Sequence, residues 1–283
     1  MRRLWQCVAA TLFNLAAWPQ SPPAAGKFFF LQMADPQFGM NTGDRGFAQE
    51  TLNYEFAIAT ANRLRPRFVV VCGDLVNKPG DEAQIAEYLR ITKKLDPSIR
   101  VYSLAGNHDV GNEPSPESLA QYRKRFGPDY YSFREGPLYG IVVNSGLIHT
   151  PKLAPAELAK QDEWLRAELA KAKQSGAPHV IVFSHHPFFL ARGDEPDQYF
   201  NIPLARRRPL LDAFRQAGVR FIFAGHYHRN ALGRDGEIEM VTTGPVGKPL
   251  GDGASGFRVV KIAGPALTHR YVDFAHLPNT LEP

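Results

Sequence analysis

Five short apolar segments of this 283-residue chain each end in a polar turn, and this repeated pattern constrains the fold more than any other feature. The segments have the β-branched and aromatic composition of buried strands. In open α/β sheets, polar side chains that follow the carboxyl ends of strands build a site at one edge. The segments are 28–34 before Asp35-Pro36-Gln37, 68–72 before Gly73-Asp74, 101–105 before Gly106-Asn107-His108-Asp109, 180–184 before His185-His186, and 221–224 before Gly225-His226-Tyr227-His228.

Helical patterns lie between these strands, so the chain has the alternation of an α/β fold. Apolar residues recur at helical spacing, and proline or serine marks several of the helix ends. A hairpin is predicted around Glu135-Gly136-Pro137. We therefore predict an α/β protein with two sheets packed face to face and helices outside them. The predicted helices are 47–64, 81–95, 115–126, 155–174 and 209–217, and three further strands are predicted at 240–243, 257–262 and 269–274.

The first 25 residues have the three parts of a secretory signal. Met1-Arg2-Arg3 is basic, residues 4–18 are mostly apolar, and the small residues of 21–26 suit a processing protease. The apolar part, of about 15 residues, is shorter than the ~20 that a membrane span requires. We expect cleavage of residues 1–25, export to the periplasm or the exterior, and no stable membrane insertion. The alternatives are an uncleaved anchor or a disordered tail on a cytoplasmic protein.

Composition and charge bear on the rest of the chain. No linker or repeat divides residues 27–274, which we predict to form one domain, and 275–283 are predicted to be a frayed tail. The formal net charge of +5 is too slight to indicate a nucleic-acid partner, and Arg206-Arg207-Arg208 is interpreted as an exposed charge run. Cys7 lies in the signal segment, which leaves Cys72 without a partner for an intramolecular disulfide.

The residues at the strand ends combine carboxylates, amide oxygens and imidazoles, which are ligands of divalent cations. Four of them would saturate one zinc ion, whereas two cations about 3.5–4 Å apart need roughly seven ligands with one carboxylate shared. Each residue alone is more typical of a turn, a helix cap or a core histidine, but their coincidence at five strand ends predicts a two-cation site. The candidates are Asp35, Gln37, Asp74, Asn107, His108, His185, His226 and His228.

These motifs resemble, in order and spacing, the signature of the calcineurin-like metallophosphoesterases. The resemblance covers nearly everything from Lys27 onward, and it implies a four-layer α/β/β/α sandwich of two mixed sheets. More narrowly, the chain is similar to the calcineurin-like phosphoesterase domain-containing type, whose animal member is regarded as a serine/threonine protein phosphatase. The narrower similarity lies in Asp35-Pro36-Gln37-Phe38-Gly39, Tyr199-Phe200-Asn201 and Gly225-His226-Tyr227-His228-Arg229-Asn230.

The resemblance also implies a role for each motif residue. A hydroxide that bridges the two cations would attack the phosphorus of a phosphoric ester. His108 would protonate the departing alkoxide, and Asp109 would orient the His108 ring. The implied ligands are Asp35, Gln37 and His228 for the first cation, Asn107, His185 and His226 for the second, and Asp74 for both.

Two residues depart from the pattern of the family. The first motif usually ends in histidine, where this chain has Gln37, and an amide oxygen is a harder ligand than an imidazole nitrogen. We therefore expect manganese, iron or magnesium in preference to zinc. Many members have an acid three residues after the shared aspartate, where this chain has Asn77, so a charged partner for His108 is missing.

Loop residues near the motifs are candidates for contacting a phosphorylated substrate. Aromatic side chains could form walls around it, and arginines could contact phosphate oxygens, although loop arginines are ordinarily solvated. The candidates are Phe38, Arg45, Tyr199, Tyr227 and Arg229.

Three functions are compatible with these observations. The leading prediction is a metal-dependent phosphomonoesterase that acts on a phosphoprotein or a small phosphorylated metabolite. The alternative enzyme is a phosphodiesterase of nucleotides or glycerophospholipid head groups. The alternative from another class is a non-catalytic binding protein that metal ions stabilise, which the weaker ligand Gln37 would allow.

Overall fold

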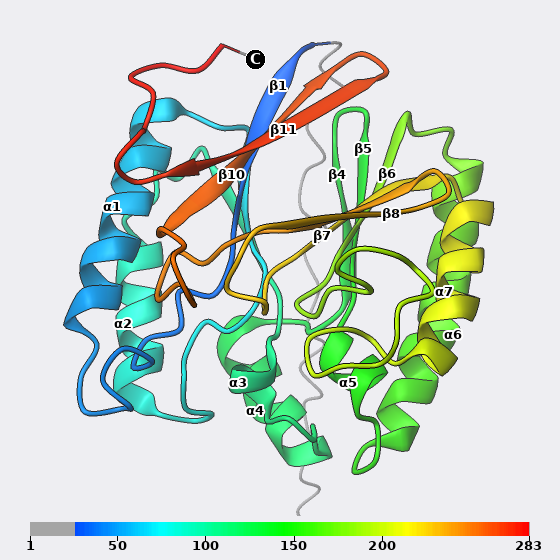
Figure 1. Ribbon diagram of the computed structural model, residues 1–283, viewed down its shortest axis with the longest axis horizontal. Helices are drawn as coiled ribbons and strands as arrows, with labels where there is room; N and C mark the ends of the chain where they lie inside the picture. Colours follow the sequence, from blue (N-terminus) through cyan, green and yellow to red (C-terminus); the bar gives the residue numbers. More distant parts are fainter. Residues whose placement is uncertain (1–25, 283) are drawn as a thin grey trace, which may run out of the picture.

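The structure is a computed structural model of the protein that describes residues 26–282. Its strands form two sheets packed face to face (Figure 1). The first sheet has the order β11 (Ala266–Asp273), β10 (Gly256–Ala263), β1 (Phe28–Met33), β2 (Phe68–Val71), β3 (Arg100–Ser103). The second has the order β4 (Tyr131–Glu135), β5 (Leu138–Val142), β6 (His179–Phe183), β7 (Val219–Ala224), β9 (Ile238–Thr242), β8 (Ala231–Asp235).

Both sheets are mixed, as predicted. In the first sheet β1, β2 and β3 run parallel, and β10 and β11 extend it through antiparallel pairs. In the second sheet β5, β6, β7 and β9 run parallel, with β4 and β8 as antiparallel edge strands. The carboxyl ends of the parallel strands therefore meet at one edge of each sheet, where the polar turns of the sequence follow them.

Helices cover the outer face of each sheet. α1 (Ala48–Leu64) and α2 (Glu82–Thr92) lie beside the first sheet, and α6 (Pro155–Gln174) and α7 (Leu204–Gln216) lie beside the second (Figure 1). The inner faces meet through aromatic rings, because the Phe30 ring centroid lies 6.1 Å from that of Phe183 and 6.0 Å from that of Phe223. The residues on either side of Phe30 in β1, Phe29 and Leu31, point the other way and pack in a second core cluster with residues of α1. The predicted α/β/β/α sandwich is confirmed.

Three described elements were not predicted, namely β8 and the short helices α3 (Asn107–Val110) and α5 (Ser145–His149). A one-turn helix is too short to show helical periodicity. The two short helices lie with α4 (Pro116–Phe126) at the end of the molecule where the parallel strands of both sheets finish (Figure 1). Asn107 and His108 therefore stand on a helical turn, which fixes their directions more tightly than a loop would.

The helix α7 begins at Leu204, before the predicted start at Pro209. Its first turn is anchored by Arg207, whose side chain is fully buried. The guanidinium donates to carbonyl groups of the preceding loop, at Ile202 (2.9 Å), Gly193 (3.1 Å) and Glu195 (3.0 Å). The interpretation of 206–208 as an exposed charge run is therefore wrong for Arg207, because its guanidinium is buried and donates to carbonyl groups inside the protein.

Residues 275–282 pack against the domain, so the prediction of a frayed tail is wrong for this part. Leu277 and Leu281 lie against the apolar core. Arg63 of α1 donates to the Pro278 carbonyl at 2.9 Å, and Lys261 of β10 donates to the Glu282 carbonyl. The apolar contacts and hydrogen bonds together hold the segment on the surface of the first sheet and α1.

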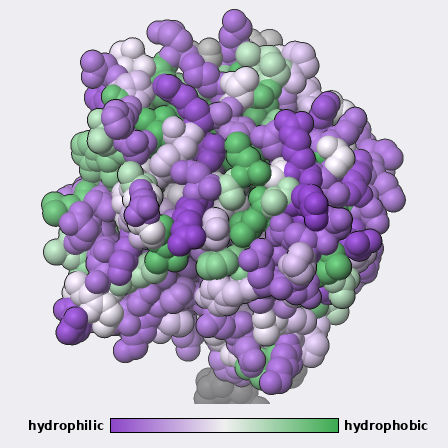
Figure 2. Space-filling view, in the orientation of Figure 1, coloured by the Kyte–Doolittle hydropathy of each residue, from purple (hydrophilic) through white to green (hydrophobic). Residues whose placement is uncertain are grey.

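The predicted signal segment, residues 1–25, lies outside the described residues. Within residues 26–282, none of the helices has both the length and the apolar character that a membrane crossing requires. Figure 2 shows hydrophilic residues over most of the face that it presents, with hydrophobic residues in small separate groups.

Candidate metal centre

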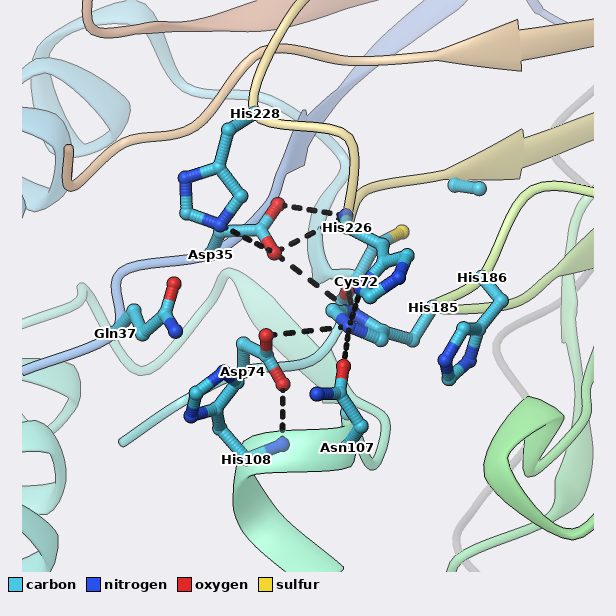
Figure 3. Close-up of polar contacts among 12 residues, drawn as sticks. Asp35, Gln37, Cys72, Asp74, Asn107, His108, His185, His186, His226 and His228 are labelled. Carbon is cyan, nitrogen blue, oxygen red and sulfur yellow. Dashed lines mark hydrogen bonds and ion pairs between the residues drawn. The ribbon is translucent and has the colours of Figure 1, made fainter. Parts of the chain in front are cut away.

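Polar side chains from five strand ends of both sheets converge on one place (Figure 3). All of them except His108 are buried. Every residue predicted as a cation ligand is present in this cluster. The residues are Asp35 and Gln37 after β1, Asp74 after β2, Asn107 and His108 after β3, His185 after β6, and His226 and His228 after β7.

Two overlapping groups within this cluster have the spacing of metal ligands. Asp74, His185 and His226 form one group, Asp35, Asp74 and His228 form the other, and the ligand atoms of each lie within 4.8 Å of one another. His185 Nε2 lies 3.3 Å from Asp74 Oδ2 and 3.1 Å from His226 Nδ1. His228 Nε2 lies 3.6 Å from Asp35 Oδ1. Asp74 is common to both groups, as a pair of cations with one shared carboxylate requires.

Five of these side chains are also held at the atom that faces away from the shared space. A carbonyl that accepts from one ring nitrogen leaves the lone pair of the other nitrogen for a cation. The contacts are His185 Nδ1 to the Cys72 carbonyl (2.9 Å), His228 Nδ1 to the Lys248 carbonyl (2.6 Å), His226 Nε2 to the Tyr199 carbonyl (3.4 Å), Gln37 Nε2 to Asn77 Oδ1 (3.1 Å) and Asn107 Nδ2 to Asn112 Oδ1 (2.8 Å). The donor set thus fits two divalent cations.

Gln37 gives the clearest sign that a cation belongs here. Its Oε1 is buried and has no hydrogen-bond partner among the described residues. Its Nε2 donates to Asn77, whose own amide donates to Asp44 at 2.8 Å, so the orientation of the Gln37 amide is fixed. A buried carbonyl oxygen without a partner is costly unless a ligand satisfies it. Gln37 Oε1 is therefore free to bind a cation, as the imidazole of the histidine that usually occupies this position would do.

The backbone of the cluster is strained. Seven non-glycine residues in the described part of the chain have a positive φ, and five of them are predicted ligands. Such a conformation costs on the order of 1–3 kcal/mol for each residue and persists where the surroundings enforce it. The five are Asp35 (49°), Gln37 (41°), Asp74 (50°), His226 (65°) and His228 (55°). The strained residues coincide with the ligands, which indicates that the backbone adopts these torsions in order to direct the ligand side chains into the cluster.

Glycines before the ligands make room for this arrangement. A Cβ on Gly106 would lie 2.1 Å from Asp74 Oδ1. One on Gly225 would lie 2.5 Å from Asp35 Oδ2, and one on Gly73 would lie 2.6 Å from His185 Nδ1. The glycine that ends these strands is therefore required by the close approach of the neighbouring ligand.

The substitution Gly106→Ala is expected to displace Asp74 from the cluster. We expect the free energy of unfolding to fall by about 1–3 kcal/mol, as overpacking usually costs, and Mn²⁺ binding to weaken. Chemical denaturation and calorimetry measure the two effects. Gly46→Ala is the matched control, because a Cβ there meets nothing within 4 Å. Unchanged stability and Mn²⁺ binding in Gly106→Ala would contradict the close packing described here.

The two carboxylates of the site have opposite pKa shifts. Burial raises the pKa of Asp35 to about 6. Burial also acts to raise the pKa of Asp74, but His185 and His108 outweigh it and hold that pKa below its usual value. For His185, burial is likewise outweighed by Asp74, which raises the pKa to about 9. Burial lowers the pKa of His226 to about 3. The shared carboxylate of Asp74 is therefore ionised throughout the physiological pH range.

His108 lies at the open side of the cluster and differs from the ligands in its contacts. Its backbone N–H donates to Asp74 Oδ1 at 2.8 Å, and its Nδ1 lies 2.6 Å from the Asn77 carbonyl. The ring nitrogen left for a substrate is therefore Nε2. The expectation that Asp109 orients this ring is wrong, because both Asp109 oxygens accept backbone N–H groups. These donors are Leu75 (2.9 Å), Val76 (3.2 Å) and Gly106 (2.7 Å).

Comparison with known proteins identifies the family. A family model described as calcineurin-like phosphoesterase matches residues 30–230. The chain is 38% identical over 268 residues to the bovine serine/threonine-protein phosphatase CPPED1, covering 89% of this chain and 85% of that protein. The human protein of the same name is 37% identical, with 93% and 90% covered. The chain belongs to the calcineurin-like phosphoesterases. It is thus a phosphoester hydrolase of a metal-binding family.

Solved structures support the fold of this phosphoesterase. A dimetal phosphatase from zebrafish aligns with a TM-score of 0.67 at 16% identity, covering 87% of this chain and 97% of that one. A purple acid phosphatase from yellow lupin seeds aligns with a TM-score of 0.66 at 15% identity, covering 89% of this chain and 52% of that one. At these identities the likeness concerns the arrangement of sheets and helices.

The residues predicted to contact substrate lie in different places around the phosphoesterase site. The Tyr199 ring is exposed, with its centroid 5.1 Å from that of the ligand His226. Tyr227 contacts Phe200 at 4.9 Å between ring centroids. The prediction for Phe38 is wrong, because this side chain is fully buried against Tyr54 and other rings. Arg45 is exposed, and its Nε donates to the Thr42 carbonyl at 2.9 Å. Arg229 lies over the Tyr227 ring at 5.5 Å.

Proposed function

We propose that this phosphoesterase is a phosphomonoesterase acting on phosphoserine or phosphothreonine in a polypeptide, or on a small phosphorylated metabolite. The observation that carries the proposal is the pair of ligand groups that share Asp74, with His108 bound to the same carboxylate through its backbone N–H. The preference for phosphorylated protein is supported by relatives of 37–38% identity that are named serine/threonine-protein phosphatases.

In this proposal each strand end supplies ligands to one of two cations. Bound there, two divalent cations would activate water at neutral pH and attract the non-bridging oxygens of the phosphate. The Oε1 of Gln37 favours manganese, iron or magnesium over zinc, because amide oxygen is a harder ligand than imidazole. The proposed ligands are Asp35, Gln37 and His228 at the first position, Asn107, His185 and His226 at the second, and Asp74 at both.

The chain itself supplies the proton for the leaving group. The contact between His108 Nδ1 and the Asn77 carbonyl fixes the orientation of the ring beside Asp74. In this orientation Nε2 would face the substrate. A protonated His108 would give its Nε2 proton to the alkoxide that leaves when the phosphoester bond breaks. Tyr199, exposed beside His226, would line the approach of that leaving group.

Removal and replacement of metal ions tests the proposal. Treatment with a chelator should abolish the hydrolysis of p-nitrophenyl phosphate, and Mn²⁺ should restore it, with Zn²⁺ the least effective of Mn²⁺, Fe²⁺, Mg²⁺ and Zn²⁺. With Mn²⁺ present, kcat/KM for bis-p-nitrophenyl phosphate should be lower by about tenfold or more, which is a difference of about 1.4 kcal/mol in barrier. Faster hydrolysis of the diester would favour the phosphodiesterase alternative. Hydrolysis that persists in full after chelation would contradict the metal centre.

A further inference from the structure

A cavity of about 480 Å³ lies directly beside the metal centre. We call it the side pocket. It is lined by the ligand His228, the two residues that follow it, and two glycine-containing turns, including Gly244, Gly251 and Asp252. His228 directs Nε2 towards Asp35 at 3.6 Å and also forms part of the pocket wall. His228 is therefore common to the metal centre and to the wall of the side pocket.

Arg229 places a cationic group in the wall of the side pocket. Its Nε donates to the Leu250 carbonyl at 3.0 Å, and its guanidinium lies over the Tyr227 ring at 5.5 Å. These two contacts hold the planar group and leave its terminal nitrogens to bind a ligand. Within residues 26–282, Arg229 forms no ion pair with a carboxylate. The sequence predicts that Arg229 contacts the reacting phosphate, whereas the structure places Arg229 in the wall of the adjacent side pocket.

Asn230 adds a neutral hydrogen-bond donor of fixed orientation. Its Oδ1 accepts from Arg258 Nη2 at 2.8 Å and from the Gly244 backbone N–H at 3.2 Å. The opposite atom, Nδ2, is therefore an N–H₂ donor on the side of Gly244. A Cβ on Gly244 would lie 3.3 Å from this nitrogen, and a Cβ on Gly251 would lie 3.4 Å from Arg229 Nη2. Glycine at both positions leaves the donors uncovered.

The charges around the side pocket favour an anion. Arg229 is in its wall, and Arg258, which is buried, stands 2.8 Å behind Asn230. The side-chain hydrogen-bond partners of Arg258 are Thr243, His269 and Asn230, and His269 Nε2 in turn lies 2.8 Å from Glu239 Oε1. Asp252 is the one acidic residue in the lining. Glu239 faces Arg258 through His269, so the cationic group available to a ligand is Arg229, and a guanidinium is well suited to bind a carboxylate.

We propose that the side pocket binds the carboxylate of an acidic residue that flanks the phosphorylated serine or threonine of a polypeptide substrate, with Arg229 and Asn230 as its donors. This inference rests on the proposed phosphatase function and names a sequence preference for it. An extended peptide with its phosphate at the metal centre places the side chains of its flanking residues beside the centre, and the side pocket adjoins the centre through His228. A guanidinium at that position distinguishes glutamate from glutamine.

Matched pairs of phosphopeptides, compared between the wild type and two Arg229 variants, test the inference. Phosphoserine peptides carry glutamate or glutamine at one of the four flanking positions, and kcat/KM is measured for the Mn²⁺-loaded wild type and for Arg229→Ala. We expect the wild type to prefer glutamate at one position at least by roughly 10-fold, as a charge-assisted hydrogen bond would give. Arg229→Ala should reduce this ratio to about one, and Arg229→Lys should retain part of it. Because each ratio is taken within one enzyme, general changes in activity cancel.

The control and the contrary outcomes separate this inference from the proposed function. Arg220→Ala removes an exposed arginine of β7 outside the pocket and should keep the wild-type glutamate preference. A wild type without preference at any position, or a preference unchanged in Arg229→Ala, would overturn the side pocket as a carboxylate site while hydrolysis continues. Failure to hydrolyse both the peptides and p-nitrophenyl phosphate would overturn the proposed function itself, and this inference with it.

Discussion

Asp74→Asn should lose phosphatase activity almost completely, with kcat for p-nitrophenyl phosphate falling by at least about 10³-fold. Asp74 is the one residue present in both ligand groups, so its replacement affects both cation positions at once. The amide keeps the shape and can still accept the His108 N–H, but it removes the negative charge that lies 3.3 Å from His185 Nε2. The loss should exceed that of a single transition-state donor, which is about 10²–10³-fold, because two charges are weakened together.

The measurement combines steady-state kinetics at saturating Mn²⁺ with the metal content of the dialysed protein. Wild type should retain about two Mn²⁺ per chain, as a two-metal site requires, and Asp74→Asn should retain fewer. Asp212→Asn is the control, because the Asp212 side chain is 66% exposed on α7 and lies outside the cluster. Two tightly bound cations in Asp74→Asn, with activity near that of the wild type, would show that Asp74 is not the shared ligand.

The convergence of the ligands could be predicted from the sequence because it depends on topology. Asp35, Asp74, Asn107, His185 and His226 each follow an apolar strand, and parallel strands bring their carboxyl ends to one edge. Of the two adjacent histidines that follow β6, His185 is the predicted ligand. His185 Nε2 lies 3.3 Å from Asp74 Oδ2, whereas His186 Nδ1 lies 2.9 Å from the Ser145 hydroxyl. Successive side chains of an extended segment point to opposite sides, which is sufficient to separate the two rings in this way.

The direction of individual loop side chains could not be predicted, because it depends on local backbone torsions. Phe38 follows Gln37, whose φ is 41°, and this turn sends the aromatic ring into the core beside α1 instead of into the site. Asp109 is one residue from His108, but on the single turn of α3 it points back to the N–H groups of Gly106 and Leu75. Adjacency in the sequence therefore indicates little about contact at a strand-to-helix turn.

The supporting residues were missed because they are far from their partners in the sequence. Asn77 was noted only as a departure from the family, yet it holds Gln37 through its side chain and His108 through its carbonyl. It thereby links a ligand from the first strand end to the proposed acid from the third. The Lys248 carbonyl similarly holds His228 from a loop that has no recognisable motif. A contact made by a backbone carbonyl does not depend on residue type, so it cannot be predicted from the sequence.

His108→Ala should reduce kcat in proportion to the need of the leaving group for a proton. For a phosphoserine peptide, whose leaving group is an alkoxide, we expect a loss of about 10²–10⁴-fold, the usual contribution of general acid catalysis. For p-nitrophenyl phosphate the loss should be much smaller, because p-nitrophenolate departs without protonation. The backbone N–H that Asp74 accepts is retained in this variant, so the Mn²⁺ content should stay near that of the wild type.

The comparison of the two esters distinguishes acid catalysis from a purely electrostatic role of His108. An imidazolium that only stabilised charge on the phosphate oxygens would serve both substrates alike, and its removal would lower both kcat values by the same factor. His276→Ala is the control, because the His276 side chain is 81% exposed and pairs with Asp273 away from the cluster. Equal losses for the two esters would assign His108 to charge stabilisation, and unchanged kinetics with both would remove it from the reaction. The expected unequal loss follows from the contact of Nδ1 with the Asn77 carbonyl, which leaves Nε2 as the nitrogen that faces the leaving group.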